Sequence, residues 1–154
     1  MSIKKEIVVT DWIKRNRYEG NFIKLTLSSD QRRILRGKRK SDCNQELYLQ
    51  LPREGKLSDG DTLLTNQIGL FVKIIAQKEN LIEITSKTDY ELTKVAYHLG
   101  NRHVEIEINE NILFTKRDYI IEELLKNFEV NLIKIKKKFS PEIGAFHHEK
   151  KSLN

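Results

Sequence analysis

Four histidines are the residues of this chain best suited to chemistry: His98, His103, His147 and His148. A neutral imidazole nitrogen is the commonest protein ligand for transition metals. His103 follows residues 100–102, which join a predicted helix to a predicted strand. Such a loop can present the imidazole to solvent with both ring nitrogens free. His103 is therefore either a metal ligand or a solvated loop histidine, and both interpretations stay open.

The other histidines have simpler interpretations. His98 lies in the predicted helix beside its apolar stripe, where packing or a hydrogen bond is favoured. His147 and His148 are adjacent near the C-terminus and are either incidental or auxiliary ligands. One histidine makes a weak metal site, but a two-fold symmetric dimer doubles every ligand. Two copies of His103 could thus meet across the axis, with the tail histidines completing the shell.

An enzyme is the weakest hypothesis, because no catalytic constellation is visible. The sequence has no glycine-rich phosphate loop and no nucleophile elbow. Cys43 has no second cysteine with which to share a zinc ion. A single cysteine and the lack of an apolar signal or membrane-spanning stretch predict a cytoplasmic protein with no membrane partner. A small-molecule-binding regulator would need a polar pocket and would respond without metal.

Positive charge is concentrated in the first half of the chain. Residues 1–76 hold 15 Lys and Arg against 9 Asp and Glu, whereas residues 77–139 hold 11 of each. The basic run 32–40 is predicted to be a solvated loop that docks an acidic protein partner or binds nucleic acid. Because the run has no interleaved aromatic residues for base stacking, protein docking is favoured. A basic nucleic-acid-binding protein using this loop is the alternative.

Alternating apolar residues predict a small β-rich, partner-docking domain over residues 1–76. The period of two is typical of half-buried strands. It runs through Ile23, Leu25, Leu27, Leu47, Leu49 and Leu51. Residues 59–61, Asp-Gly-Asp, predict a turn, because glycine accepts a positive φ and aspartate bonds its own backbone. No α-helix is expected in this half.

Residues 77–139 alternate between strand and helix periods. Strands are predicted near 81–85, 104–108, 112–115 and 132–135, with helices between the first pair and the last pair. Thr88 and Thr115 are the predicted helix N-caps, and Gly100 is expected to end the first helix. This βαββαβ order predicts an α+β chain whose second domain is ferredoxin-like. Because it carries His103, this domain is the candidate dimerisation and metal-binding domain.

Two further features complete this picture. Tyr90 and Tyr97 fall on one face of the first helix, opposite its apolar stripe, which favours a subunit or domain contact. Residues 140–154 show no periodicity and are predicted to form a flexible metal-binding tail.

The segment from Tyr97 to His103, Tyr-His-Leu-Gly-Asn-Arg-His, resembles the HLGNRH signature of UreE, a family of urease accessory proteins that carry nickel. Residues 36–42, 49–53 and 59–63 resemble that family's first-domain landmarks. Residues 141–146 resemble its PExGAY element, with Phe146 in place of the tyrosine. The resemblance spans nearly the whole chain.

The resemblance implies a homodimeric, non-enzymatic metallochaperone that delivers Ni(II) to the urease apoprotein with the help of urease accessory proteins, including the accessory GTPase. It makes His103 the interfacial nickel ligand, paired with its symmetry mate, and His98 a motif residue but not the principal ligand. Imidazoles also accept Zn(II) or Cu(II). Many relatives have long histidine-rich tails, whereas this tail has His147 and His148, so extra storage sites are not expected.

Overall fold

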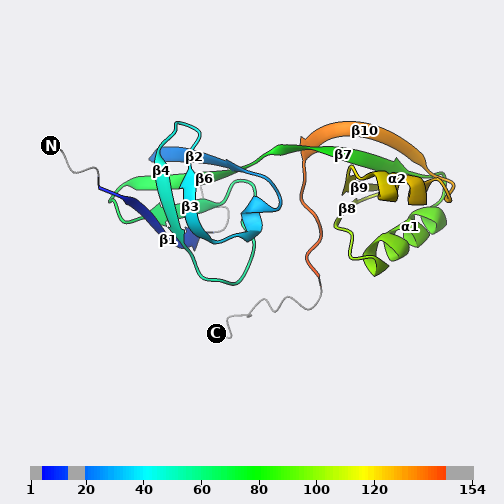
Figure 1. Ribbon diagram of the computed structural model, residues 1–154, viewed down its shortest axis with the longest axis horizontal. Helices are drawn as coiled ribbons and strands as arrows, with labels where there is room; N and C mark the ends of the chain where they lie inside the picture. The colour runs from blue at the N-terminus through cyan, green and yellow to red at the C-terminus, as the bar shows by residue number, and fades with distance from the viewer. Residues whose placement is uncertain (1–4, 14–19, 145–154) are drawn as a thin grey trace. The chain divides into compact units, whose positions relative to one another are not determined.

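The computed structural model describes residues 5–13 and 20–144 (Figure 1). They form two compact units that meet in the sequence between Gln77 and Lys78. The first unit is built on a six-stranded sheet, and the second combines a four-stranded sheet with two α-helices. The prediction of a mixed α+β chain is confirmed. Within the described ranges, none of the helices has the length and apolar character needed to cross a membrane.

The sheet of the first unit has the strand order β2-β6-β5-β1-β4-β3. Its strands are β1 (Ile7–Ile13), β2 (Asn21–Leu27), β3 (Arg36–Lys40), β4 (Glu46–Gln50), β5 (Thr62–Thr65) and β6 (Leu70–Ala76). β1 pairs with β4, and β2 with β6, in parallel, and the other neighbours are antiparallel. The predicted alternation is confirmed, because the apolar residues of β2 and β4 point into one buried cluster.

Asp42 connects the two edge strands of this sheet. Its carboxylate accepts hydrogen bonds from the N–H of Thr26 at 2.9 Å and from the Thr26 hydroxyl at 2.7 Å. The N–H of Asp42 donates to the carbonyl of Lys24 at 2.9 Å. Thr26 and Lys24 lie in β2, whereas Asp42 follows β3. The sheet is therefore curled, and its edges approach each other at this residue.

The prediction that residues 32–40 form a solvated loop is wrong. The run begins in a short 3-10 helix, η1 (Gln31–Arg33), and continues as the edge strand β3. The Arg32 side chain is only 1% exposed. Gly37 adopts a φ of 115°, a conformation that glycine tolerates and that residues with a Cβ atom rarely adopt. Lysine and arginine on an edge strand also discourage pairing with another sheet, so a basic run is compatible with a strand.

The second unit follows the predicted order of strand, helix, strand, strand, helix and strand. Its elements are β7 (Lys78–Thr85), α1 (Asp89–Asn101), β8 (Ile106–Asn109), β9 (Ile112–Lys116), α2 (Tyr119–Leu125) and β10 (Asn131–Lys138). The sheet order is β10-β7-β9-β8, with every pair antiparallel. Leu92, Val95 and Leu99 of α1 form one buried cluster with Ile82 and Ile84 of β7.

Side-chain caps fix where both helices start. The hydroxyl of Thr88 accepts a hydrogen bond from the Glu91 N–H at 3.3 Å, as the sequence predicts for α1. For α2 the cap is Asp118, whose carboxylate accepts from the Ile121 N–H at 3.0 Å. The prediction of Thr115 as that cap is wrong, because Thr115 lies within β9 and its hydroxyl donates to the Glu105 carbonyl at 3.1 Å.

The sheet face away from the helices is partly covered by the chain that follows β10. Phe139 is fully buried against Leu81 and Phe114. The N–H of Glu142 donates to the Ile106 carbonyl at 2.8 Å. The segment predicted to be flexible from residue 140 onward is thus held against the sheet as far as Glu142.

Candidate metal-binding site

His103 occupies a helix-terminating position that glycine usually fills. α1 runs to Asn101, Arg102 is its C-cap, and His103 has a left-handed φ of 58°. The N–H of His103 donates to the Gly100 carbonyl at 3.0 Å, and the N–H of Val104 donates to the Leu99 carbonyl at 3.0 Å. These two bonds form a Schellman motif, and Val104 packs against the buried cluster that contains Leu99.

The prediction that Gly100 ends α1 is therefore wrong. Gly100 is a helical residue with open space where a side chain would be. The chain reverses three residues later, and Val104 then packs against the buried cluster that includes Leu99. His103 consequently takes the left-handed conformation, which costs a residue with a Cβ atom about 1–2 kcal/mol.

The His103 side chain is exposed, and its ring forms no hydrogen bond within the part of the chain that the structure describes. Its backbone is fixed by the two bonds of the helix end, while both ring nitrogens face no competing protein partner there. Unusual backbone conformations of this kind concentrate at functional sites, because the surrounding structure must hold them in place. An exposed imidazole on a fixed backbone suits a borderline metal ion such as nickel(II).

Replacing His103 with glycine is expected to stabilise the metal-free protein by about 1 kcal/mol, because glycine adopts the left-handed conformation without the Cβ clash. The same change removes the imidazole and is expected to abolish the nickel binding that the family resemblance predicts. Urea denaturation of the metal-free protein measures the first effect, and calorimetric titration with nickel measures the second. His103→Ala, which keeps the clash, is the matched control. A marked loss of stability in the glycine variant would show that the imidazole contributes to packing instead.

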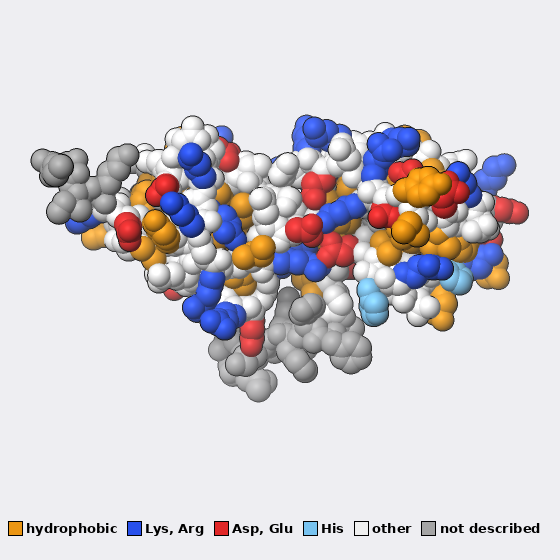
Figure 2. Space-filling model, in the orientation of Figure 1, with side chains coloured by type: hydrophobic (Ala, Val, Ile, Leu, Met, Phe, Trp, Pro, Cys, Tyr) orange, Lys and Arg blue, Asp and Glu red, His pale blue; other side chains and the backbone are white. Residues whose placement is uncertain are grey.

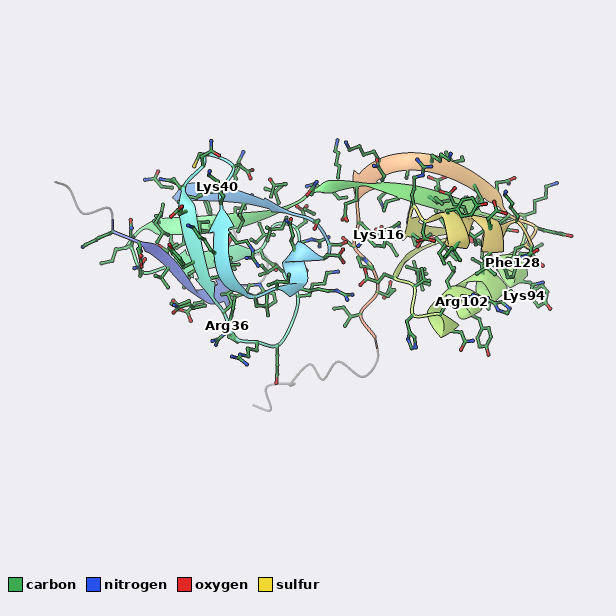
Figure 3. The ribbon with its side chains drawn as sticks, in the orientation of Figure 1. Arg36, Lys40, Lys94, Arg102, Lys116 and Phe128 are labelled. Atoms are coloured by element: carbon green, nitrogen blue, oxygen red, sulfur yellow. The ribbon has the colours of Figure 1, made fainter. Side chains whose placement is uncertain are left out.

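His98 has a different environment. Its ring centroid lies 5.3 Å from that of Tyr97 in an edge-on arrangement and 5.4 Å from that of Phe128. Phe128 packs against the buried cluster under α1, and Figure 3 labels it beside that helix. These contacts support the interpretation of His98 as a packing residue.

The structure does not bring the predicted ligands together. His147 and His148 lie outside the described residues. Among the residues that are described, no three His, Cys, Asp or Glu side chains form a group suited to hold a metal. Figure 2 shows pale blue histidine side chains at the surface of the second unit, so an external ligand would have access to them.

A groove of about 410 Å³ adjoins His103 and was not anticipated from the sequence. Val104, Ile120 and Ile121 give it a largely apolar lining. Its charged lining residues are of both signs, since Arg102 and Lys116, labelled in Figure 3, are accompanied by Glu105 and Asp118. It is not the polar pocket that a small-molecule-binding regulator would need. The sequence signal was the position of Arg102, Val104 and Glu105 next to His103. The other lining residues come from β9, from α2 and from the N-cap of α2, which the sequence does not place beside His103.

One face of α1, the helix that ends shortly before His103, carries two exposed tyrosines. Tyr90 and Tyr97 are 71% and 68% exposed, as expected for residues opposite the apolar stripe. Between them, the Lys94 ammonium lies 4.8 Å from the Tyr90 ring centroid and 2.6 Å from the Glu91 carboxylate. The hydrogen bond from Lys94 lowers the pKa of Glu91, and the same bond raises the pKa of Lys94. Two exposed tyrosines on one face favour a contact surface.

Comparison with known proteins adds the family context. Residues 79–153 match the family described as "UreE urease accessory protein, C-terminal domain". The chain is 81% identical over 154 residues to the urease accessory protein UreE of Prochlorococcus marinus subsp. pastoris, covering all of both chains. It is 64% identical over 149 residues to that of Prochlorococcus marinus strain MIT 9301, covering 97% of this chain and 100% of the relative. It is 40% identical over 124 residues to that of a Synechococcus sp., covering 80% and 71%.

Proposed function

The chain belongs to the UreE family of urease accessory proteins, and we propose that it is a nickel metallochaperone that delivers Ni(II) for assembly of the urease active site. The observation that carries the proposal is the His103 imidazole, exposed on a left-handed helix end and free of hydrogen bonds within the described residues. Nickel(II) accepts imidazole nitrogens, and an exposed site allows exchange with ligands of a partner. Zn(II) and Cu(II) are expected to compete for the same nitrogens.

The proposed site lies between two copies of the chain. The unit from Lys78 onward is proposed to be a ferredoxin-like domain that forms a homodimer in the cytoplasm through the Tyr90 and Tyr97 face of α1. His103 follows directly from that helix, so a two-fold axis near its C-terminal end would bring two imidazoles together. His147 and His148 are proposed to supply further nitrogen ligands.

Calorimetric titration with nickel, combined with light scattering, tests this proposal. We expect one tight nickel ion per dimer and a mass of twice 18.1 kDa. Binding should weaken on acidification, because imidazole must be deprotonated to bind a metal. A protein that remains monomeric with nickel, or that binds no nickel at neutral pH, would contradict the proposal.

The first unit is proposed to dock the urease apoprotein and the urease accessory proteins, including the accessory GTPase. Its charge excess and the basic edge strand β3 support a surface for an acidic partner. Lys38 and Lys40 are exposed there, and the hydrogen bond to the Glu46 carboxylate raises the pKa of Lys38, so that it stays cationic.

Reversing the charge of Lys40 is expected to weaken association with the urease maturation proteins about three- to tenfold, chiefly by slowing association. Nickel affinity should not change, because Lys40 belongs to the other unit. Lys73→Glu is the matched control, since Lys73 is an exposed lysine of β6 in the same unit. Surface plasmon resonance at two salt concentrations measures both variants. Loss of nickel binding with intact partner binding would reverse this division of roles.

The alternative, nucleic-acid binding through residues 32–40, is less well supported by the geometry. Arg32 is buried, Arg36 donates to the Leu51 carbonyl at 3.2 Å, and Arg39 donates to the Ile34 carbonyl at 3.1 Å. These arginines are thus engaged with the protein's own backbone. A salt-dependent titration with nonspecific RNA would detect phosphate binding if this alternative were correct.

A further inference from the structure

We propose that β10 is a docking strand, to which an acidic, extended segment of a partner protein adds as a further strand of the second sheet. β10 runs from Asn131 to Lys138 and lies at one edge of the order β10-β7-β9-β8. The inference uses none of the proposed nickel ligands, so it goes beyond the proposed function and does not depend on it.

The outer edge of β10 is open in the described structure. All eight residues of β10 pair with β7 in antiparallel register, from Asn131 with Thr85 to Lys138 with Lys78. In such a pair every second residue exchanges both backbone bonds with its partner, so about half of the residues direct N–H and C=O groups away from β7. Among the described residues, no backbone hydrogen bond links residues 131–137 to an element other than β7. These groups are therefore available to a further strand (Figure 1).

The other edge of the same sheet is partly occupied. On β8, the Ile106 carbonyl accepts a hydrogen bond from the Glu142 N–H at 2.8 Å, so the chain that follows β10 covers part of that edge. Open edges invite pairing with other chains, and proteins commonly cover them or protect them with charge. β10 is therefore the edge at which an added strand meets no competing segment among the described residues.

Lysines determine which strands can pair with this edge. β10 contains four lysines and no acidic residue in the sequence Asn-Leu-Ile-Lys-Ile-Lys-Lys-Lys. Lys134, Lys136 and Lys138 alternate along the strand, so they share one face at intervals of about 7 Å. Lys134 and Lys136 are exposed and form no ion pair within the described residues, whereas Lys137 on the other face lies 2.7 Å from the Glu107 carboxylate. Figure 2 shows basic side chains along the side of the second unit where Figure 1 places β10.

This spacing matches that of carboxylates on an added strand. The side chains of any strand alternate with the same period of two, so acidic residues at every second position would lie opposite Lys134, Lys136 and Lys138. Opposite charges in directly facing positions stabilise the pairing of two strands, and like charges destabilise it. The lysines would therefore repel a basic strand and favour an acidic one.

The first half of β10 is apolar instead of basic. Leu132 and Ile133 are 37% and 51% exposed, and as neighbours in a strand they lie on opposite faces. Covering these side chains with apolar side chains of a partner would remove them from water, which is favourable. The expected segment is therefore acidic opposite the second half of β10 and apolar opposite the first half.

A row of lysines can also bind the phosphates of a nucleic acid. Proteins that bind single strands usually add aromatic side chains on which the bases stack, and β10 has none. A phosphate backbone would also leave Leu132 and Ile133 exposed and would not continue the ladder of the sheet. An acidic peptide uses all three features of the edge, namely its backbone groups, its lysines and its apolar residues.

Fluorescence anisotropy with a labelled peptide tests the proposal on the full-length protein. The probe is Glu-Thr-Glu-Val-Glu-Val-Leu, whose glutamates lie opposite Lys138, Lys136 and Lys134 when it runs antiparallel to β10. Lys134→Glu combined with Lys136→Glu is expected to weaken binding about tenfold or more, because two favourable charge pairs become repulsive. Lys73→Glu combined with Lys87→Glu is the matched control, since both are exposed lysines outside β10 and the net charge changes equally.

Two N-methylated forms of the probe separate strand addition from simple charge attraction. In an added strand, one set of alternate amides faces β10 and the other set faces solvent. Methylating the first set blocks the ladder and should weaken binding about tenfold or more, whereas methylating the second set should change it less than about twofold. Both methylated peptides keep the charge and the side chains of the probe.

Equal binding of the two methylated peptides, or an equal loss in the β10 variant and the control variant, would overturn the proposal. So would the absence of peptide binding at millimolar concentration. Tighter binding of labelled oligouridine than of the peptide, abolished by the same β10 reversal, would assign the edge to nucleic acid instead. Thermal unfolding of each variant checks the fold, and Lys134→Gln with Lys136→Gln, expected to weaken binding about threefold, replaces the reversal if that variant does not fold. Nickel affinity, measured by calorimetry on the same variants, should not change, so failure of this inference is distinct from failure of the proposed function.

Discussion

Replacing His103 with alanine is expected to lower nickel affinity by at least about a hundredfold and to remove the tight site proposed for the dimer. Substituting a residue that merely orients a metal ligand typically costs about 10–100-fold in affinity. Here both copies of the ligand itself would be lost. The backbone of His103 is held by two helix-end hydrogen bonds, so its position is set before metal arrives and little ordering is needed on binding.

Two further variants provide the comparisons needed to interpret the loss of nickel affinity in His103→Ala. Substituting His147 and His148 with alanine should weaken binding less, because tail residues must be ordered when metal binds, at about 1 kcal/mol or more per residue. His98→Ala should leave nickel affinity nearly unchanged, because His98 packs on Tyr97 and Phe128. Calorimetry at constant pH measures all three. Wild-type affinity in a dimer of His103→Ala would remove the main support for the nickel-carrier proposal.

The location of His103 could be predicted from the sequence, but its backbone conformation could not. Its position between a helix and a strand followed from local periodicity. Gly100 was the natural candidate for the left-handed residue, because glycine favours that conformation. His103 takes this conformation instead because Val104, the residue after it, packs against the buried cluster that contains Leu99, and that packing is a property of the folded core.

In the first unit too, part of the structure could be predicted from the sequence and part could not. Alternation identified β2 and β4, because one face of each is buried. It could not identify the parallel pairing of β1 with β4, since periodicity carries no information on which strands are neighbours. The strand β3 was missed because its sequence, Arg-Gly-Lys-Arg-Lys, has no apolar alternation. It is held by backbone pairing with β4.

The hydrogen bonds that Glu107 accepts from Lys137 and Ser140 could not be predicted from the sequence. Its partners Lys137 and Ser140 are 30 and 33 residues away, and only the sheet order brings β10 and β8 to opposite edges of one surface. In the sequence it is one of three glutamates in the stretch 101–110. Hydrogen-bond donors that lie this far away along the chain leave no local pattern in the sequence.

Replacing Tyr97 with glutamate is expected to dissociate the proposed homodimer and to remove tight nickel binding with it. In a dimer formed through this face of α1, the new carboxylate would be buried without a partner. An unpaired buried charge costs about 3–5 kcal/mol. Because each 1.4 kcal/mol is a factor of ten, the dimer dissociation constant should rise by a hundredfold or more. Two His103 imidazoles would then no longer meet, so the metal would lose half of its anchoring ligands.

Tyr119→Glu provides the matched control, because Tyr119 is a similarly exposed tyrosine, 76% accessible, at the start of α2. Light scattering across a concentration series gives the dissociation constant of each variant, and calorimetry gives its nickel affinity. If both variants dissociate alike, the contact is not specific to α1. If Tyr97→Glu stays dimeric and keeps its nickel, the interface lies elsewhere on the second unit. If it becomes monomeric but still binds nickel tightly, the site is complete within one subunit, and pairing of two His103 residues is not how the metal is held.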